Sequence, residues 1–222
     1  MGFEDQVKEY ISNYVEGHII TKSDIEKTFN YILDEELRQR ITKEFYIARY
    51  IYKFFQGMSA VDELLEAQVR LQVIMYANIY EAVLHYILFE LYGDEQIVID
   101  LKNITAPIEI YIPEHKKDKI SKALVHEEKE IKTYYIGNKK RELTKIRFDE
   151  KADAAYQLGL LDEELKNEVI TIYNLRNGIH LHAEIRKQIS WDLDMSKKAY
   201  WRIEKLNQLV SAKLIADNKV AG

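Results

Sequence analysis

Proline and glycine are scarce in this chain, and their placement limits the fold more than any other feature of the sequence. Two prolines and eight glycines occur among 222 residues, and both prolines, Pro107 and Pro113, fall in one short stretch. Long runs without these helix breakers, rich in Leu, Ile, Glu, Lys and Ala, favour helix. We therefore predict an all-α, mainly helical bundle with a small β-hairpin or extended insertion at about residues 104–148.

Apolar periodicity, glycines and capping residues divide the chain into predicted elements. We place an N-terminal helical extension at residues 1–57 and a helical domain at 58–222, whose insertion, 100–148, is basic. The predicted helices are two or three within 1–57 that end at Gly57, a long one from Val61 to Tyr92 that Gly93 stops, a short one from about Asp149 before a turn at Gly159, a longer one capped by Asp162, and a last one from about Asp192 or Ser196 to Asn218.

An amphipathic pattern marks residues 29–55, FNYILDEELRQRITKEFYIARYIYKFF. Apolar residues recur at helical spacing, at Ile32, Leu37, Ile41, Phe45, Ala48 and Ile51. Such a face can pack on the protein's own core, or it can form a docking surface for a partner or second subunit. Both interpretations remain open at this stage.

The insertion shows strand-like patterns. The segment NITAPIEIYIPEH, residues 103–115, is β-branched and alternating, which indicates a short strand or an extended loop. Further on, IKTYYIGNKKRELTKIRF alternates apolar and aromatic residues around Gly137 and Asn138. A Gly-Asn pair between such runs predicts a hairpin turn.

Charge is unevenly distributed along the chain. The net charge of −5 argues against a general polyanion binder, but residues 115–147 hold eleven Lys or Arg against five Asp or Glu. Tyr134, Tyr135 and Phe148 lie in or beside this stretch, where they could stack on bases. The alternative is an ordinary solvated face. If the stretch binds RNA, the residues we expect to contact phosphates are Lys139, Lys140, Arg141, Lys145 and Arg147.

Several classes of protein are disfavoured by composition. Cysteine is absent, which excludes disulfides, a thiolate nucleophile and a cysteine-bound metal, and fits a reducing compartment. The first residues, MGFEDQVKEY, lack a signal-peptide pattern. The most apolar window, residues 71–92, is interrupted by five polar residues, so it predicts a core helix rather than a membrane span. We expect a cytoplasmic protein without a membrane segment.

The stretch YNLRNGIHLH, residues 173–182, combines an arginine, an asparagine and two histidines at the end of a predicted helix. Counting back from Arg176 at helical spacing reaches Ile172, Val169 and Leu165, so the guanidinium continues the apolar line that faces the core. A charge at such a position requires either a buried partner or a function.

This stretch resembles the signature of the HEPN superfamily of small helical proteins, in which an arginine, usually followed by a polar residue, precedes a histidine by four to six residues. Arg176, Asn177 and His182 match, with five residues between arginine and histidine. The helix YANIYEAVLHYILFELYG, with its internal Glu81, and the segment YQLGLLDEELKNEVITIYNLRN are also similar to family elements. Residues 60–215 would form the HEPN core.

The resemblance implies a metal-independent endoribonuclease that needs no cofactor and joins two copies of the motif across a homodimer interface. Such proteins often act as toxins or in phage defence, so the expected partners are RNA, a second copy, and an antitoxin or defence-system protein. The resemblance also implies a catalytically silent alternative, an RNA-binding or assembly subunit. In one branch a tyrosine two residues after the histidine is modified; here Glu184 takes that place after His182, so that regulation is not expected.

The residue types suit this chemistry. A histidine titrates near neutral pH and can take the proton of a ribose 2′-hydroxyl, while the permanently charged Arg176 can stabilise charge on the phosphoryl oxygens. Asn177 would orient these groups by hydrogen bonds. Family spacing favours His182 as the proton-transfer group, whereas a straight helix would place His180 on the face of Arg176.

Two further interpretations of the motif remain. Arg176 could form a buried ion pair with Glu81 or Glu184 while the histidines cap the helix end. His180 and His182 could also bind a metal together with Glu184, although no third distant group of ligands is evident in the sequence. We therefore expect no metal.

Overall fold

The computed structural model describes residues 2–123 and 133–220, which belong to two compact units. One unit comprises Met1–Gly93 and Arg147–Gly222, and the other comprises Asp94–Ile146. About 71% of the chain is helical, and the described residues contain a two-stranded antiparallel sheet. These features confirm the predicted mainly helical fold with a small β-hairpin.

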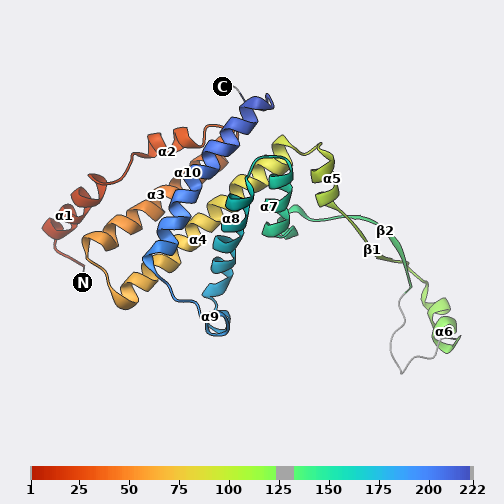
Figure 1. Ribbon diagram of the computed structural model, residues 1–222. Helices are drawn as coiled ribbons and strands as arrows, with labels where there is room; N and C mark the ends of the chain where they lie inside the picture. The colour runs from red at the N-terminus through yellow and green to blue at the C-terminus, as the bar shows by residue number, and fades with distance from the viewer. Residues whose placement is uncertain (1, 124–132, 221–222) are drawn as a thin grey trace. The chain divides into compact units, whose positions relative to one another are not determined.

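The larger unit is built from helices alone in its described residues (Figure 1). In chain order they are α1 (Asp5–Glu16), α2 (Lys22–Thr28), α3 (Glu35–Gly57), α4 (Asp62–Tyr86), a π-helical turn (Ile87–Leu91), α7 (Phe148–Gln157), α8 (Glu163–Arg176), a 3-10 turn (Asn177–Ile179), α9 (Leu181–Lys187) and α10 (Leu193–Ala216).

Helix α4 lies at the centre of this unit, in contact with α3, α8 and α10 (Figure 1). Because it is covered on several sides, its apolar residues are not confined to one stripe. Its buried side chains include Val69, Val73, Tyr76, Ala77, Ile79, Tyr80, Val83 and Leu84. No helix among the described residues is long and apolar enough to cross a membrane.

Local sequence signals account for where the helices begin and end. The Asp162 carboxylate accepts a hydrogen bond from the Leu165 amide at 2.7 Å, and Asp192 caps α10 in the same way. Gly159 has a φ of +76°, a conformation that glycine adopts without strain, and it ends the turn before α8. Helix α3 ends at Gly57, as predicted. These boundaries are confirmed.

The N-terminal segment belongs to the larger unit. On the apolar face predicted for residues 29–55, Ile32, Ile41, Phe45 and Ala48 are buried, while Leu37 and Ile51 are half-buried. The Phe45 ring contacts the Tyr76 ring of α4 edge-on, with centroids 6.1 Å apart. The Tyr31 hydroxyl donates to Asn207 Oδ1 of α10 at 2.6 Å. This face therefore packs on the protein's own core. The domain boundary placed at residue 57 stays a prediction.

The smaller unit contains the sheet. Its elements are α5 (Gln96–Lys102), β1 (Asn103–Glu109), α6 (Glu114–Ala123), β2 (Tyr134–Lys140) and a 3-10 turn (Leu143–Lys145). The strands pair in antiparallel fashion, from Asn103 opposite Lys140 to Glu109 opposite Tyr134. Pro107 lacks a donor for the ladder and sits in a strand with one partner, as expected for an edge.

The predicted hairpin turn at Gly137 and Asn138 is wrong. Both residues lie inside β2, opposite Ala106 and Thr105, so the partner strand comes from earlier in the chain rather than from directly across a two-residue turn. Gly137 lies close to two neighbouring side chains, which would have to shift to admit a larger residue. A Cβ atom there would lie 2.9 Å from the Ile108 side chain and 2.8 Å from the Tyr135 ring, closer than real Cβ contacts.

Candidate functional site

The Arg–His stretch lies where α8 gives way to α9. Helix α8 ends at Arg176, the 3-10 turn follows, and α9 begins at Leu181. Gly178 is buried in the turn, where an added Cβ atom would collide with the side chain of Ile189. A larger residue at 178 would therefore require the Ile189 side chain to move. The α-helix does not continue through the motif, because α8 ends at Arg176 and the 3-10 turn follows.

Arg176 forms an ion pair with Glu81 of α4. Its Nη1 donates to Glu81 Oε2 at 2.7 Å and to the Tyr173 hydroxyl at 3.0 Å, and that hydroxyl donates to the same Oε2 at 3.1 Å. The arginine side chain is 32% exposed and the glutamate 30%. Of the two partners considered from the sequence, Glu81 is the one in contact. Because neither side chain is sealed from solvent, the guanidinium can still be reached from outside.

Lys151 of α7 completes a group that we call the Glu81 cluster: Glu81, Lys151, Tyr173 and Arg176. The lysine is 1% exposed, and its Nζ lies 3.6 Å from Glu81 Oε1. Burial lowers the pKa of Lys151, and the nearby Glu81 opposes that shift. Burial likewise raises the pKa of Tyr173, with the Glu81 charge as the next cause. Two cations thus face one carboxylate at this end of α8.

Sequence reasoning named Glu81 and Arg176 but missed Lys151 and Tyr173. A signal for Lys151 was available, because it lies three residues after Phe148 and four before Ala155, on the buried face of α7. Tyr173 stacks on the Phe148 ring, with centroids 4.1 Å apart and planes at 8°. The ring of Tyr173 thus packs on α7, while its hydroxyl contacts Glu81 and the Arg176 guanidinium.

Asn177, His180 and His182 are exposed. His180 occupies the cap position before α9, but its side chain makes no capping hydrogen bond; its carbonyl accepts from the amides of Ala183 and Glu184 instead. The argument that His180 shares a face with Arg176 assumed one straight helix. That assumption is wrong, since the helix ends at Arg176. Helix geometry therefore no longer favours His180 over His182.

A second carboxylate fixes the other side of the motif. Glu184 of α9 pairs with Arg70 of α4 through a short contact, and it also accepts a hydrogen bond from Trp191 Nε1 at 2.9 Å. The Arg70 guanidinium lies over the Trp191 ring, 5.5 Å from its centroid. Glu184 is thus engaged by cationic and N–H groups. Within residues 2–123 and 133–220 no three His, Asp or Glu side chains are grouped as metal ligands would be.

The basic residues proposed for RNA contact are placed in both units. Lys139 and Lys140 are exposed on β2, the same strand that carries the exposed rings of Tyr134 and Tyr135. Two other basic residues have acidic neighbours: Lys145 pairs with Glu142 at 2.7 Å, and Arg147, in the larger unit, pairs with Asp149 at 2.6 Å. The Arg141 amide donates to the Lys102 carbonyl at 2.8 Å. Residues 124–132 of the basic stretch lie outside the described residues.

Comparison with known proteins does not assign a class. No protein-family model, curated protein or solved structure matches the chain. The function must therefore be argued from the chemistry of the side chains themselves.

Proposed function

We propose that this protein is a metal-independent endoribonuclease of the HEPN type, acting in the cytoplasm as a toxin or in phage defence. One observation carries the proposal. The stretch from Arg176 to Glu184 is held on α4 at both ends, by the Arg176–Glu81 and Glu184–Arg70 ion pairs, while Asn177, His180 and His182 between them are exposed. A segment that is anchored at both ends and exposes polar side chains between them is suited to bind a large substrate from solution.

The chemistry divides among these side chains. A histidine, His180 or His182, takes the proton from a ribose 2′-hydroxyl, which then attacks the adjacent phosphorus. Arg176 stabilises the charge that grows on the phosphoryl oxygens. Its Nη1 is occupied by Glu81 and Tyr173, but its Nε and Nη2 make no hydrogen bond to the described residues, so they can bind phosphate. Asn177 orients the phosphate. The attack breaks the bond between phosphorus and the 5′-oxygen, and that oxygen takes a proton from the protonated histidine or from water, so the products carry a 2′,3′-cyclic phosphate and a 5′-hydroxyl.

Two copies of the motif complete the site in this proposal. Arg176 is only partly exposed, and a second subunit supplies the opposite wall of a cleft around it. Mixing tests the arrangement. If arginine and histidine come from different chains, an inactive Arg176→Ala protein mixed with an inactive histidine variant should regain part of the wild-type activity. Failure to regain activity despite subunit exchange would contradict the shared site.

A catalytically silent module is the alternative, and the Glu81 contact favours it. The carboxylate partly neutralises the guanidinium, and an RNA phosphate must compete with it. In that case the protein serves as an RNA-binding or assembly subunit and cleaves nothing.

One experiment separates these functions. Purified protein is incubated with total RNA and EDTA, beside Arg176→Ala, His180→Ala and His182→Ala variants. We expect cleavage by the wild type with 2′,3′-cyclic phosphate ends, loss of cleavage in Arg176→Ala, and unequal effects of the two histidine variants. RNA binding without cleavage by the wild type supports the silent module. Cleavage that EDTA abolishes refutes the mechanism.

A further inference from the structure

A cationic pocket lies on the other side of α4 from the Glu81 cluster. It has a volume of about 320 Å³ and is lined by residues of α3, α4 and α10, including Gln72. Gln72 precedes Glu81 by nine residues, which turns the two side chains to roughly opposite sides of the helix at about 100° per residue. The pocket is therefore separate from the Arg–His stretch.

Positive charge in this pocket is not balanced by its own lining. The lining includes Arg49, Lys53 and Lys197 and no acidic residue. Within the described parts of the chain Arg49 has no carboxylate within 4 Å, and its guanidinium stacks instead on the Tyr200 ring, 4.2 Å from the centroid. Lys197 pairs with the exposed Asp194 outside the pocket at 3.3 Å. Such a pocket attracts an anion.

A buried hydroxyl whose own proton has no acceptor lies in the wall of the same pocket. Tyr76 is 0% exposed, and its hydroxyl makes no well-formed hydrogen bond to the described residues, although Arg49 and Gln72 lie close to its oxygen and oppose the rise of its pKa. Burial raises the pKa of Tyr76, so the hydroxyl keeps its proton and remains a donor. A buried polar group without a partner is costly, and an anionic oxygen entering the pocket would satisfy it.

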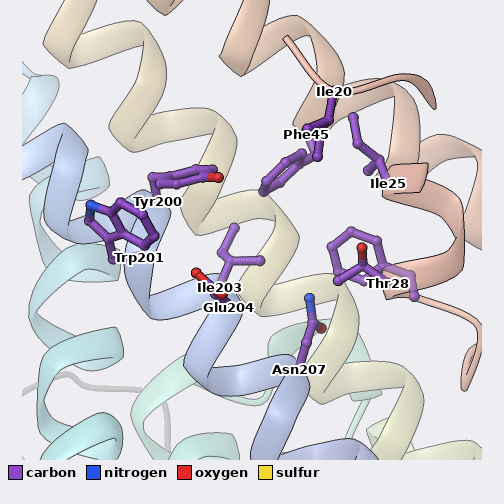
Figure 2. Close-up of a pocket in the computed structure, with 10 residues that line it drawn as sticks. Ile20, Ile25, Thr28, Phe45, Tyr200, Trp201, Ile203, Glu204 and Asn207 are labelled. Carbon is purple, nitrogen blue, oxygen red and sulfur yellow. The ribbon is translucent and has the colours of Figure 1, made fainter. Parts of the chain in front are cut away.

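An apolar pocket adjoins the cationic one and shares Tyr200 and Trp201 with it. It has a volume of about 280 Å³, and Phe45 and Ile203 are among the apolar residues that line it (Figure 2). Asn207 is 5% exposed, and its Nδ2 has no hydrogen-bond partner among the described residues. Figure 2 shows the amide of Asn207 directed toward the space below Phe45. This pocket therefore combines mainly apolar and aromatic walls with one unused donor, and the polar residues Thr28 and Glu204 also line it.

We propose that the two pockets together bind a phosphate ester of an aromatic heterocycle, the chemistry of a nucleoside monophosphate. The phosphate binds Arg49, Lys53 and Lys197 and accepts a hydrogen bond from the Tyr76 hydroxyl. The ring enters the apolar pocket beside Trp201 and presents an acceptor to the Asn207 amide. Trp201 is 57% exposed, and the stacked ring of the ligand covers part of it. This binding is independent of RNA cleavage.

Calorimetry on the full chain tests the proposal, with adenosine 5′-monophosphate, uridine 5′-monophosphate, inorganic phosphate and adenosine as separate ligands. We expect a monophosphate to bind roughly tenfold or more tightly than phosphate or adenosine alone, because each pocket contributes. A 5′-phosphorylated trinucleotide distinguishes a free nucleotide from the end of an RNA chain, and binding of either supports the site. No heat with any of these ligands at about 1 mM overturns the proposal.

Variants locate the site. Arg49→Gln and Lys53→Gln should each weaken monophosphate binding roughly tenfold, the effect of losing one charge-assisted contact. Tyr76→Phe removes only the hydroxyl and should weaken binding severalfold. Lys43→Gln, which removes an exposed charge from the same helix, is the matched control and should bind as the wild type does. If folded Arg49→Gln and Lys53→Gln proteins both bind with wild-type affinity, the proposed site is excluded.

Discussion

Replacing Glu81 by glutamine should destabilise the protein chiefly through Lys151. The substitution keeps the shape of the side chain but removes the carboxylate within 4 Å of a lysine that is 1% exposed. It also removes the charge that Arg176 contacts at 2.7 Å. Arg176 is about one-third exposed and can be hydrated, whereas Lys151 cannot, so the lysine determines the size of the effect.

The expected loss of stability in Glu81→Gln follows from how exposed Lys151 and Glu81 are. Removing one partner of a fully buried ion pair costs about 3–5 kcal/mol. Glu81 is 30% exposed, so water already weakens the pair, and Lys151 can lose its proton instead of remaining charged. We therefore expect the free energy of unfolding to fall by about 2–3 kcal/mol at pH 7. Glu66→Gln, which removes an exposed partner of Arg70 on the same helix, should cost about 0.5 kcal/mol or less.

Urea unfolding of single and double variants measures the effect. Adding Lys151→Met to Glu81→Gln should restore most of the lost stability, because the buried charge is then gone as well. If Glu81→Gln costs no more than Glu66→Gln, or if Lys151→Met in that background restores nothing, Lys151 is not the origin of the effect.

The pH dependence has a definite sign. The folded-state pKa of Lys151 lies below its ordinary value, and Glu81 is the charge that holds it up. Between the folded and unfolded pKa values the unfolded chain binds more protons, so the free energy of unfolding rises with pH in that interval. Glu81→Gln lowers the folded pKa further and widens the interval. The deficit of the variant relative to wild type should therefore shrink from pH 7 to about pH 9.5.

Three further predictions concern the motif turn, a helix cap and the basic strand. Gly178→Ala should lower the free energy of unfolding by about 1–3 kcal/mol in thermal melts, and Ile189→Ala in that background should recover part of the loss, unless the side chain of Ile189 moves freely. Asp162→Ala removes the acceptor for the Leu165 amide and should cost about 1–2 kcal/mol at pH 7 in urea unfolding. Because hydrogen bonding to that amide lowers the pKa of Asp162, the cost is fully present above its ordinary pKa and should disappear as pH falls through the folded value. Replacing the three basic residues at 139–141 by glutamine should weaken RNA binding in filter assays and flatten its salt dependence, whereas unchanged low-salt affinity would exclude this strand.

Helix boundaries could be predicted from the sequence because the interactions that set them are local. Asp162 caps an amide three residues away, and Gly159 adopts its left-handed conformation within a single turn. The Gly137–Asn138 prediction failed for the opposite reason. The alternation of apolar and aromatic residues around Gly137 and Asn138 correctly indicated a strand. The residues opposite this pair, Ala106 and Thr105, lie more than thirty positions earlier in the chain, and no local sequence signal specifies that separation.

The candidate site shows the same contrast between features set by local sequence and contacts between distant segments. The sequence places Arg176 on an apolar line, and this position alone predicts that the arginine has either a partner or a function. Which glutamate it contacts, Glu81 or Glu184, depends on how α8 packs against α4, and Glu81 lies 95 residues earlier in the chain than Arg176. Lys151 was missed because a lysine in a helix is normally solvated, although its spacing from Phe148 and Ala155 places it on the buried face of α7.

The position of each histidine relative to Arg176 could not be predicted for another reason. Assigning a shared face to Arg176 and His180 required an unbroken helix, yet Gly178 lies between them and glycine has a low helix propensity. The structure shows that the α-helix ends at Arg176 and a 3-10 turn follows. Residue spacing identifies side chains on a common face only within one regular element. Across a turn, the number of residues between the arginine and the histidine gives only the length of the connecting segment and not the direction of the side chains. Either His180 or His182 can then be the group that transfers the proton. This is why separate His180→Ala and His182→Ala variants are required to assign proton transfer.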